Sequence, residues 1–388
     1  MSKKFGVGVV GAGAIFPSHL QAYKFLSGRF QIVGIADTDE VRLRQAGQKH
    51  FLPVSTKNYG ELLERPDIDI IDICTPPGIH AQIVKDALRA GKYVISEKPL
   101  APNLAEIDEL IEFARDFPGR LSTVFQRRYA ADVEKLMRLK DDESLGQLVG
   151  GTFNRTARGA FVKAAKNWGN WKMSGGGTVM TQFVHELDLM CLVYGEPESV
   201  SATMGTVHLD IESEDVFAAT VRFKQGAIVS CSSSTGVGKS GVLFDVVGNK
   251  KIHRYASKDD SSGGGSGLAR LQTLATKVIR VGTERVKAKL GRPTPPRGDG
   301  GSHRPYFDAI LKALDMGQPL PVGPEAARPA VELATGIYTS AILGRPVKFP
   351  LDASTPYYHG VSAEDYRASQ AVSSSEHELT AVEGRQVG

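Results

Sequence analysis

The sequence predicts an α/β plus α+β protein, in which a doubly wound parallel sheet precedes a C-terminal domain with an open, mostly antiparallel sheet and helices. Three observations lead to this fold class. Short β-branched runs alternate with helical stretches as far as about residue 125, and the later strand candidates follow one another without such helices. The chain has 388 residues, which suits two domains of ordinary size.

The expected N-terminal domain spans residues 1–125. The segments between its strands, such as HAQIVKDALRAGK and NLAEIDELIEFARD, carry apolar residues at helical spacing. Repeated strand–helix units make successive strands parallel, because each helix carries the chain back across the sheet. The predicted strands are FGVGVV, QIVGIAD, DIIDICT, KYVISE and LSTVF.

The expected second domain spans residues 126–352. A KQGA turn at Lys224–Ala227 separates two of its strand candidates, and short turns of this kind join antiparallel neighbours. A sheet of such strands has one face on the core and one face toward water. The predicted strands are LVGGTFNRT, SVSATMGTVHL, DVFAATVRF, AIVSCSSS and VLFDVVG.

Two segments differ from their surroundings. Residues 257–300 are interpreted as an insertion, in which a Gly/Ser-rich loop leads into the basic, helical stretch Leu268–Arg292. A surface helix or an oligomer arm is favoured for this stretch over a surface for an anionic ligand or a membrane. Residues 353–388 are expected to be a C-terminal extension, partly disordered because its last part is polar.

Composition excludes several classes of partner. The formal charge of +4 is too small to indicate nucleic acid, and no apolar run approaches the roughly 20 residues of a membrane span. Cys74, Cys191 and Cys231 lie far apart, and the nine histidines show no ligand spacing with Cys, Asp or Glu. We therefore expect a reducing compartment, no metal and, since no leader pattern precedes the first strand, a soluble cytoplasmic protein.

The first strand–helix turn, VGVVGAGAIFPSHL, resembles a phosphate-binding turn. Gly11 and Gly13 supply the first two glycines of a G-x-G-x-x-G pattern, and Ala14 and Ile15 complete the turn before Phe16 takes the third position. Asp37 ends the second strand, where an aspartate accepts hydrogen bonds from adenosine ribose hydroxyls and repels a 2′-phosphate. The pattern favours NAD over NADP. An ordinary tight turn, with Asp37 as a capping residue, is the alternative.

Two further strand ends indicate the same edge of the sheet. Ligands of open α/β sheets bind beyond the carboxyl ends of the strands. CTPPGIH and SEKP both follow predicted strands, and a third such end continues into Gln126. A solvated surface turn is the alternative for Lys98. The residues expected to bind the cofactor here are Thr75, Pro76, His80, Glu97, Lys98 and Gln126.

The run VMTQFVHELDLMCLVYGEP predicts an amphipathic helix that Gly195 and Pro197 end. Thr181, His185 and Asp188 share one face at i, i+4 and i+7. A histidine beside an apolar stripe is usually a satisfied core residue, so spacing alone leaves His185 open. The stripe itself consists of Val179, Met180, Phe183, Val184, Leu187, Met190, Cys191 and Tyr194.

Taken together, these motifs resemble the Gfo/Idh/MocA family of dinucleotide-dependent oxidoreductases. The matching pieces are VGVVGAGAI, TPPGIH, EKPLA, FQRRY, the helix of His185 and the C-terminal run from HRPYFDAI to VKFPL, in the family's order. The resemblance implies a Rossmann fold, a substrate-binding and oligomerisation domain, and assembly through the outer face of the second sheet as a homodimer or homotetramer. It also implies a catalytic Lys98 near the nicotinamide and a cis peptide before Pro99.

The resemblance also implies a catalytic role for His185. The family's usual aspartate one turn earlier is replaced here by Thr181, although some branches acting on modified sugars lack it too. A hydroxyl cannot serve as a carboxylate base, so the acid and base roles are expected of His185 and Lys98. Thr181 and Gln182 are expected only to hydrogen-bond the substrate.

Further substrate contacts are expected from segments that line the substrate face in relatives. Tryptophan rings stack on sugar surfaces, and arginines bind anions. These residues therefore indicate a carbohydrate substrate, with acidic sugars among the candidates. Core tryptophans and solvated arginines are the alternative. The residues are Arg128, Arg155, Trp168 and Trp171.

The leading expectation is an NAD-dependent dehydrogenase that transfers hydride between a secondary hydroxyl of a sugar, sugar derivative or cyclitol and the nicotinamide. The alternative is a redox-neutral glycosidase, in which transient oxidation allows elimination before the hydride returns. A non-catalytic sugar or dinucleotide sensor is a third hypothesis, which the presence of Lys98 and His185 disfavours.

Overall fold

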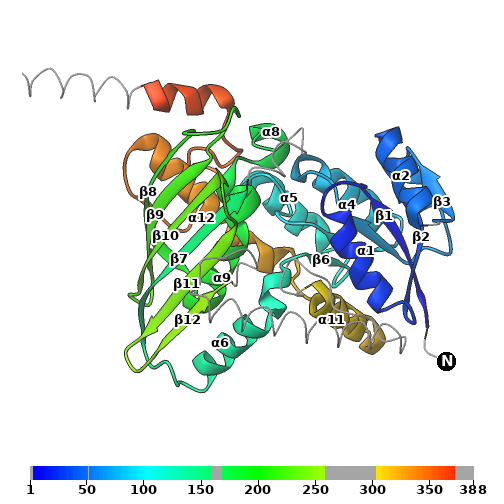
Figure 1. Cartoon of the computed structure of the whole chain (residues 1–388), viewed down its shortest axis with the longest axis horizontal. Helices are drawn as coiled ribbons and strands as arrows, with labels where there is room; N and C mark the ends of the chain where they lie inside the picture. The colour runs from blue at the N-terminus through cyan, green and yellow to red at the C-terminus, as the bar shows by residue number, and fades with distance from the viewer. Residues whose placement is uncertain (1–2, 51, 159–167, 258–302, 372–388) are drawn as a thin grey trace, which may run out of the picture.

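The computed structural model describes residues 3–50, 52–158, 168–257 and 303–371 and contains two sheets. In Figure 1 the second sheet lies on the left and the first sheet on the right, with helices between them. The predicted basic stretch Leu268–Arg292 lies outside the described residues, as do residues 372–388. The predicted domain boundaries stay a prediction.

The first sheet has six strands in the order β3-β2-β1-β4-β5-β6, and every neighbouring pair is parallel. The order reverses between β1 and β4, which makes their carboxyl ends the switch point where such sheets bind ligands. Only β3 escaped prediction, because three residues show no periodicity. The strands are β1 (Phe5–Val10), β2 (Phe30–Ala36), β3 (Val54–Thr56), β4 (Ile70–Ile73), β5 (Tyr93–Ser96) and β6 (Leu121–Thr123).

Helices connect these strands, and their sequences explain where they begin. Asn103 caps α5: its Oδ1 accepts from the Glu106 backbone N–H at 3.0 Å, and its Nδ2 donates to the Glu106 carboxylate at 2.9 Å. A capping side chain satisfies a backbone donor that the helix itself leaves open. The helices are α1 (Phe16–Phe25), α2 (Glu40–His50), α3 (Gly60–Leu63), α4 (His80–Arg89) and α5 (Leu104–Ala114).

The second sheet has seven strands in the order β12-β11-β7-β10-β9-β8-β13. Only the pair β7 and β10 is parallel, so the prediction of a mostly antiparallel sheet is confirmed. The strands are β7 (Leu148–Arg158), β8 (Pro197–Gly205), β9 (Val216–Phe223), β10 (Ile228–Val237), β11 (Gly241–Gly248), β12 (Ile252–Ala256) and β13 (Val347–Lys348).

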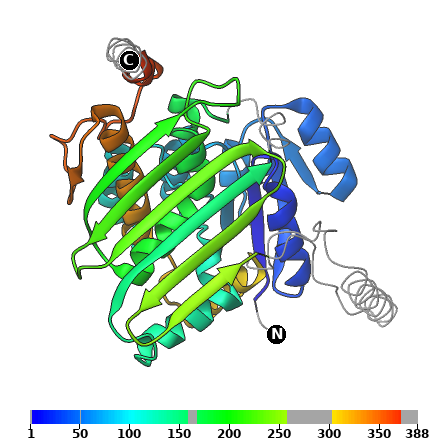
Figure 2. The same cartoon turned by 60° about the vertical axis from the view of Figure 1, so that its left-hand side comes forward.

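The two faces of this sheet differ. Along β9, buried Phe217, Ala219, Val221 and Phe223 alternate with more exposed residues, which is the pattern of a sheet with one face on the core. Figure 2 shows the other face toward the viewer, with helices behind the sheet. The predicted homodimer or homotetramer stays a prediction.

The helices between the sheets carry much of the core. A π-helical turn, η3 (Val179–Phe183), leads into α9 (Val184–Tyr194), which packs against α12 (Pro324–Leu343). All residues from Val184 to Met190 are buried, so the prediction of an amphipathic helix was wrong. The helix is enclosed because the sheet and α12 cover different sides of it.

Among the described residues, no helix combines the length and apolar character that a membrane crossing requires.

Segments late in the chain return to both sheets. Helix α11 (His303–Met316) packs against α1, and Phe307 meets the rings of His19 and Tyr23 at 5.4 and 4.6 Å between centroids. Residues 363–371 are helical, and the buried Tyr366 contacts Thr206 through its hydroxyl at 2.9 Å. The remaining helices are α6 (Ala131–Asp141) and α8 (Trp171–Ser174), with short 3-10 turns η1 (Pro77–Ile79) and η2 (Gln126–Tyr129).

A buried carboxylate holds the glycine-rich turn that precedes η3. Glu214 accepts hydrogen bonds from the backbone N–H groups of Gly177 at 3.0 Å and Val179 at 2.9 Å, and from the Tyr338 hydroxyl at 3.1 Å. A Cβ at Gly177 would lie 1.8 Å from the Glu214 carbonyl oxygen, so only glycine fits there. Burial raises the pKa of Glu214 to about 7 despite these donors.

We expect this carboxylate to make stability depend on pH. Its folded-state pKa of about 7 exceeds the ordinary value of 4.5, so the folded state binds the proton more tightly and stability falls as pH rises between these values. Between pH 5 and 8 the wild type should lose roughly 2–3 kcal/mol more unfolding free energy than Glu214→Gln. Urea titrations at both pH values measure this difference.

The matched control is Glu198→Gln, which replaces an exposed glutamate of β8 and should keep the wild-type pH dependence. An equal pH dependence in Glu214→Gln and wild type would show that Glu214 is not the group that titrates.

Candidate active site

Backbone pairing gathers four loops at the carboxyl edge of the first sheet. The Gly11 N–H donates to the Ala36 carbonyl at 2.8 Å, the Cys74 N–H to Val10 at 2.7 Å, and the Glu97 N–H to Ile73 at 2.9 Å. These bonds continue the ladders beyond the strands themselves. The predicted glycine turn, CTPPGIH and SEKP segments therefore lie side by side.

The glycine turn is shaped for a close approach. Gly11 has φ of 103°, and a Cβ there would lie 2.6 Å from the Cys74 carbonyl oxygen. At Gly13 the nearest atom to an added Cβ is 3.9 Å away, so its surface is open. Helix α1 then starts after Ile15 without a side-chain cap, so its amino end can face an anion such as a pyrophosphate, although Pro17 has no N–H and the Ser18 N–H donates to the Ile15 carbonyl at 3.0 Å. Phe16, at the third glycine position, is buried.

Asp37, directly after β2, stabilises this turn by accepting hydrogen bonds from backbone N–H groups. Its Oδ2 accepts from the Ala12 N–H at 2.7 Å, and its Oδ1 accepts from the Asp39 N–H at 2.8 Å. A carboxylate has about four lone-pair positions, so both oxygens retain capacity for ribose hydroxyls. Helix α2 is capped by Asp39, whose Oδ1 accepts from the N–H groups of Val41 at 2.9 Å and Arg42 at 3.1 Å. Asp37 therefore holds turns and caps no helix, and its predicted cofactor role stays a prediction.

Two predicted cofactor residues have side chains that point into the protein. The ring of His80 is buried and contacts the carbonyl oxygens of Thr75 at 2.8 Å and Pro99 at 2.9 Å. The Glu97 side chain, 5% exposed, contacts His19 Nε2 at 2.8 Å. Both side chains therefore hold their loops in place, and their contact with the cofactor stays a prediction.

Other predicted residues offer polar atoms to a ligand. Thr75 Oγ1 and Gln126 Oε1 are buried and have no hydrogen-bond partner among the described residues. Buried polar atoms are normally paired, so a bound group is a natural partner for each. Together with open Gly13 and the uncapped helix, these atoms fit a dinucleotide along the edge of the sheet.

Lys98 emerges from this edge toward the helix of His185. Its Nζ donates to the Thr181 carbonyl at 2.7 Å, and its peptide bond to Pro99 is cis, as predicted. Burial and the Arg155 cation lower the pKa of Lys98, whereas the Glu97 and Glu186 carboxylates raise it, and the net direction is downward. The ammonium group is therefore both fixed and easier to deprotonate than a surface lysine.

His185 lies in a strongly positive setting. The side chain is 6% exposed, its ring meets Phe125 edge-on at 6.0 Å, and Nδ1 has no partner among the described residues. Burial, followed by the charges of Lys98 and Arg155, lowers its pKa well below 6.5. The imidazole is thus neutral at pH 7 and able to accept a proton.

Glu186 is a site residue that the sequence did not reveal. It is completely buried, and its Oε1 accepts from Arg155 Nη1 at 2.9 Å. Its Oε2 and the Nε atoms of Arg155 and Arg127 are buried without partners among the described residues. The only available signal was a charged residue beside His185 in an otherwise apolar run. Arg155 therefore stays a predicted substrate contact, with Glu186 beside it.

Two predicted substrate contacts are corrected by their partners. Arg128 forms a bidentate pair with Asp188 at 2.6 and 2.9 Å and also donates to the Ala326 carbonyl at 2.8 Å, so it joins helices. Trp171 is 4% exposed, donates from Nε1 to the Glu212 carbonyl at 2.9 Å and packs on Tyr338, so it belongs to the core. Trp168 is partly buried.

The remaining predicted contacts lie in the π-helical turn. Thr181 and Gln182 are partly exposed, and the Thr181 hydroxyl donates to the Gly177 carbonyl at 2.6 Å. The Thr181 side chain is thus used within the turn, while its carbonyl receives Lys98. Their roles toward substrate stay predictions.

A buried ionic group under the site also escaped sequence analysis. His19 of α1 lies between the carboxylates of Asp72 and Glu97, at 2.9 and 2.8 Å. Two sets of described residues could supply three metal ligands, namely His19, Glu97 and His303, and His19, Asp72 and Cys74. Both ring nitrogens of His19 already face carboxylates, so neither set indicates a metal.

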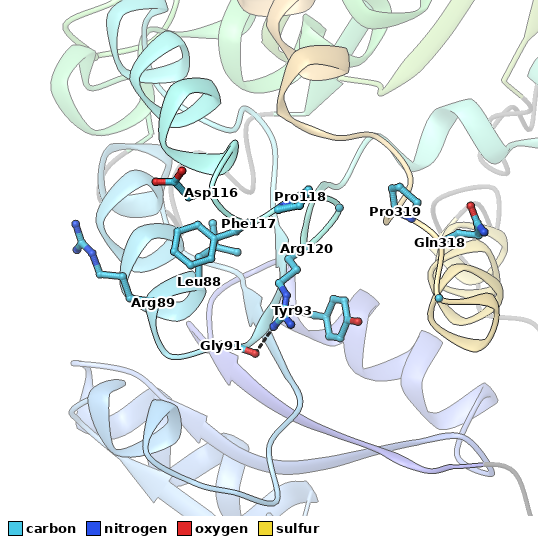
Figure 3. Close-up of a pocket in the computed structure, with 12 residues that line it drawn as sticks. Leu88, Arg89, Gly91, Tyr93, Asp116, Phe117, Pro118, Arg120, Gln318 and Pro319 are labelled. Carbon is cyan, nitrogen blue, oxygen red and sulfur yellow. Dashed lines mark hydrogen bonds between the residues drawn. The ribbon is translucent and has the colours of Figure 1, made fainter.

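A separate hollow lies at the opposite edge of the first sheet. Figure 3 shows Tyr93, which begins β5, and Arg120, which precedes β6, beside Pro319. Its volume is about 680 Å³. Since this hollow is at the amino ends of the strands, it is not the expected dinucleotide site.

Comparisons with known proteins agree with this geometry. The family model "Oxidoreductase family, NAD-binding Rossmann fold" matches residues 5–125, and the "GFO/IDH/MocA C-terminal domain" matches residues 133–253. A myo-inositol 2-dehydrogenase from Thermotoga maritima is 29% identical over 227 residues, which are 57% of this chain and 66% of that protein. A trans-1,2-dihydrobenzene-1,2-diol dehydrogenase from Xenopus tropicalis is 31% identical over 50% of this chain and 59% of its own length.

Solved structures share the fold at lower identity. The WlbA dehydrogenase from Bordetella pertussis, in complex with NADH and UDP-GlcNAcA, has a TM-score of 0.74 at 23% identity, covering 91% of this chain and 99% of that one. Levoglucosan dehydrogenase in complex with NADH has a TM-score of 0.72 at 18% identity, covering 90% and 100%. The chain therefore belongs to the Gfo/Idh/MocA family of oxidoreductases, and its first sheet is that family's NAD-binding Rossmann fold.

Proposed function

We propose that this protein is an NAD-dependent dehydrogenase that oxidises a secondary hydroxyl of a sugar, sugar derivative or cyclitol. The observation that carries the proposal is the pairing of a neutral, buried His185 with a fixed Lys98 ammonium group at the carboxyl edge of the Rossmann sheet. A base and a cation on either side of one hydroxyl are what such an oxidation requires. The myo-inositol 2-dehydrogenase and levoglucosan dehydrogenase to which the chain is similar are named for activities of the same class.

Each residue has a distinct task in this proposal. One ring nitrogen of His185 accepts the hydroxyl proton, and Lys98 stabilises the negative charge that develops on the oxygen. The hydride acceptor is the nicotinamide that NAD supplies when bound. Gly11, Gly13 and Asp37 would hold the adenosine and pyrophosphate side of that cofactor, while Thr75 and Gln126 offer polar atoms closer to the chemistry.

The charges around His185 favour a substrate that carries a negative group. Burial, followed by the cations Lys98, Arg155 and Arg127, lowers the pKa of His185. Each cation also has a carboxylate, because Glu97 acts on Lys98, Glu186 pairs with Arg155, and Asp132 pairs with Arg127 at 3.3 Å. The Nε atoms of Arg155 and Arg127 are nevertheless buried without partners among the described residues. A sugar acid would supply acceptors for them, and we propose that class within the wider one.

The function is tested by incubating the pure protein with NAD and a panel of sugars, cyclitols, sugar acids and aryl glycosides. Absorbance of NADH and release of aglycone are followed in the same wells. We expect NADH to accumulate, with kcat/KM higher for a sugar acid than for the matching neutral sugar. Aglycone release at catalytic NAD without NADH would instead establish the redox-neutral glycosidase. No turnover with any class, despite NAD binding, would support the sensor hypothesis.

Removing either proposed catalytic group should abolish turnover while keeping the cofactor site. We expect His185→Asn and Lys98→Met each to lower kcat by about 10²- to 10⁴-fold, because each removes a group that acts on the reacting oxygen. The Kd for NAD, measured by fluorescence titration, should change little. His208→Asn, at an exposed histidine, is the matched control. Normal turnover in either catalytic variant would remove that residue from the mechanism.

The pH profile of the wild type provides a second readout. His185 must be neutral to accept a proton, and its pKa lies well below 6.5, so kcat/KM should hold through pH 6.5 and fall only in more acidic solution. Lys98 must be protonated, and its pKa lies below 10.5, so activity should fall before that pH is reached. An acidic limb at or above pH 6.5 would contradict the role of His185.

A further inference from the structure

A fully buried histidine lies beneath the turn that carries Lys98. His19, on α1, has no exposed surface, and its Nδ1 lies 2.9 Å from Asp72 Oδ2 on β4. Its Nε2 lies 2.8 Å from Glu97 Oε1. The Tyr23 hydroxyl, one helical turn along α1, donates to the same Asp72 oxygen at 2.9 Å. The ring therefore bridges two neighbouring strand ends of the Rossmann sheet.

The geometry requires that the ring donates at both nitrogens. Each nitrogen faces a carboxylate, and an ionised carboxylate can only accept, so His19 is an imidazolium. Burial alone would lower the pKa of His19, but Asp72 and the other neighbours raise it well above 6.5. Burial would raise the pKa of Glu97, and the contact with His19 reverses this so that the net direction is downward. The charges on the two groups stabilise each other.

The Glu97 carboxylate connects His19 to Lys98. While Oε1 is held by His19, Oε2 accepts from the backbone N–H of Lys98 at 3.1 Å. The Lys98 side chain then runs to the Thr181 carbonyl at 2.7 Å. One carboxylate thus connects the buried imidazolium to the peptide from which the ammonium group starts.

We propose that His19 is a positioning residue, which through Glu97 fixes the Lys98 peptide and so the place of the Lys98 ammonium group in the active site. This inference rests on the proposed function of Lys98. His19 cannot touch substrate itself, because it is enclosed by the rings of Phe307 and His303, both at 5.4 Å between centroids. Its effect must therefore be indirect.

The charge of His19 makes the pH dependence of activity a test, because a purely structural role would leave that pH dependence unchanged. The groups that act on Lys98 are Glu97 and Glu186, which favour its protonated form, and Arg155, which disfavours it. Lys98 in turn acts on His185. Without the His19 cation, the Glu97 carboxylate stays ionised at the alkaline pH where Lys98 titrates, and its charge is no longer offset by the imidazolium. Lys98 then keeps its proton to higher pH, and the alkaline limb of the activity profile moves in the alkaline direction.

The test compares His19→Gln with wild type on the substrate found in the panel. Glutamine can donate to only one of the two carboxylates. The groups that surround the ring at position 19 are Asp72, Tyr23, Cys74, Glu97 and His303. We expect kcat to fall by about 10- to 100-fold, since misplacement of a reacting group by about 1 Å has effects of this size. The Kd for NAD should stay within about twofold, and the alkaline limb of kcat should shift to higher pH.

The controls separate folding from positioning. His253→Gln, at a buried histidine of β12, should keep kcat and its pH profile. If His19→Gln does not fold, judged by its circular dichroism and thermal melt, Glu97→Gln is used, for which an opposite, acidic shift is expected because the carboxylate that raises the pKa of Lys98 is gone. An unshifted alkaline limb with wild-type kcat in the folded variant would overturn the inference.

The outcome is also distinguishable from a failure of the proposed function. An active Lys98→Met protein would remove the catalytic lysine and the proposal together. An inactive Lys98→Met protein alongside a normal His19→Gln protein would leave the function intact and overturn only the positioning role.

Discussion

The structure depends on one hydrogen bond, from Lys98 Nζ to the Thr181 carbonyl at 2.7 Å, which joins the carboxyl edge of the Rossmann sheet to the π-helical turn before His185. In a π-helical turn the backbone departs from the α-helical register, and functional sites often contain such turns. Here a carbonyl of that turn accepts from the Lys98 ammonium group. Lys98, which follows β5, is therefore tied to the turn that leads into the helix of His185.

Buried charges around this bond occur in compensated sets. Asp72 and Glu97 flank His19, Arg155 pairs with Glu186, and Arg128 pairs with Asp188. Burying charges costs several kcal/mol per ion, and pairing largely offsets that cost without adding much stability. These pairs mainly fix the orientation of their side chains, because each pair allows few geometries. His185 has no carboxylate partner among the described residues. Burial, followed by the charges of Lys98 and Arg155, lowers its pKa, and the ring stays neutral.

The sequence predicted the fold well because hydrophobic periodicity and turn residues such as glycine and proline are local properties of the chain. Both sheets and the glycine turn follow from such signals, while the cis peptide at Pro99 was expected from the family resemblance. Three-residue β3 and two-residue β13 are too short to show a period, and five-residue β12 was also not predicted. Side-chain direction was predicted poorly, since Glu97, His80 and Trp171 turn inward for reasons that only tertiary contacts supply. His19 was missed because its two partners lie 53 and 78 residues away.

The most direct measurement is a crystal structure of the full chain with bound NAD. The pyrophosphate should lie against Gly13 and the amino end of α1, and the nicotinamide ring should lie beside Lys98 and His185. That result would place hydride transfer where the proposed base and cation are. A nicotinamide remote from both residues, or a dinucleotide in the hollow of Figure 3, would contradict the proposed site.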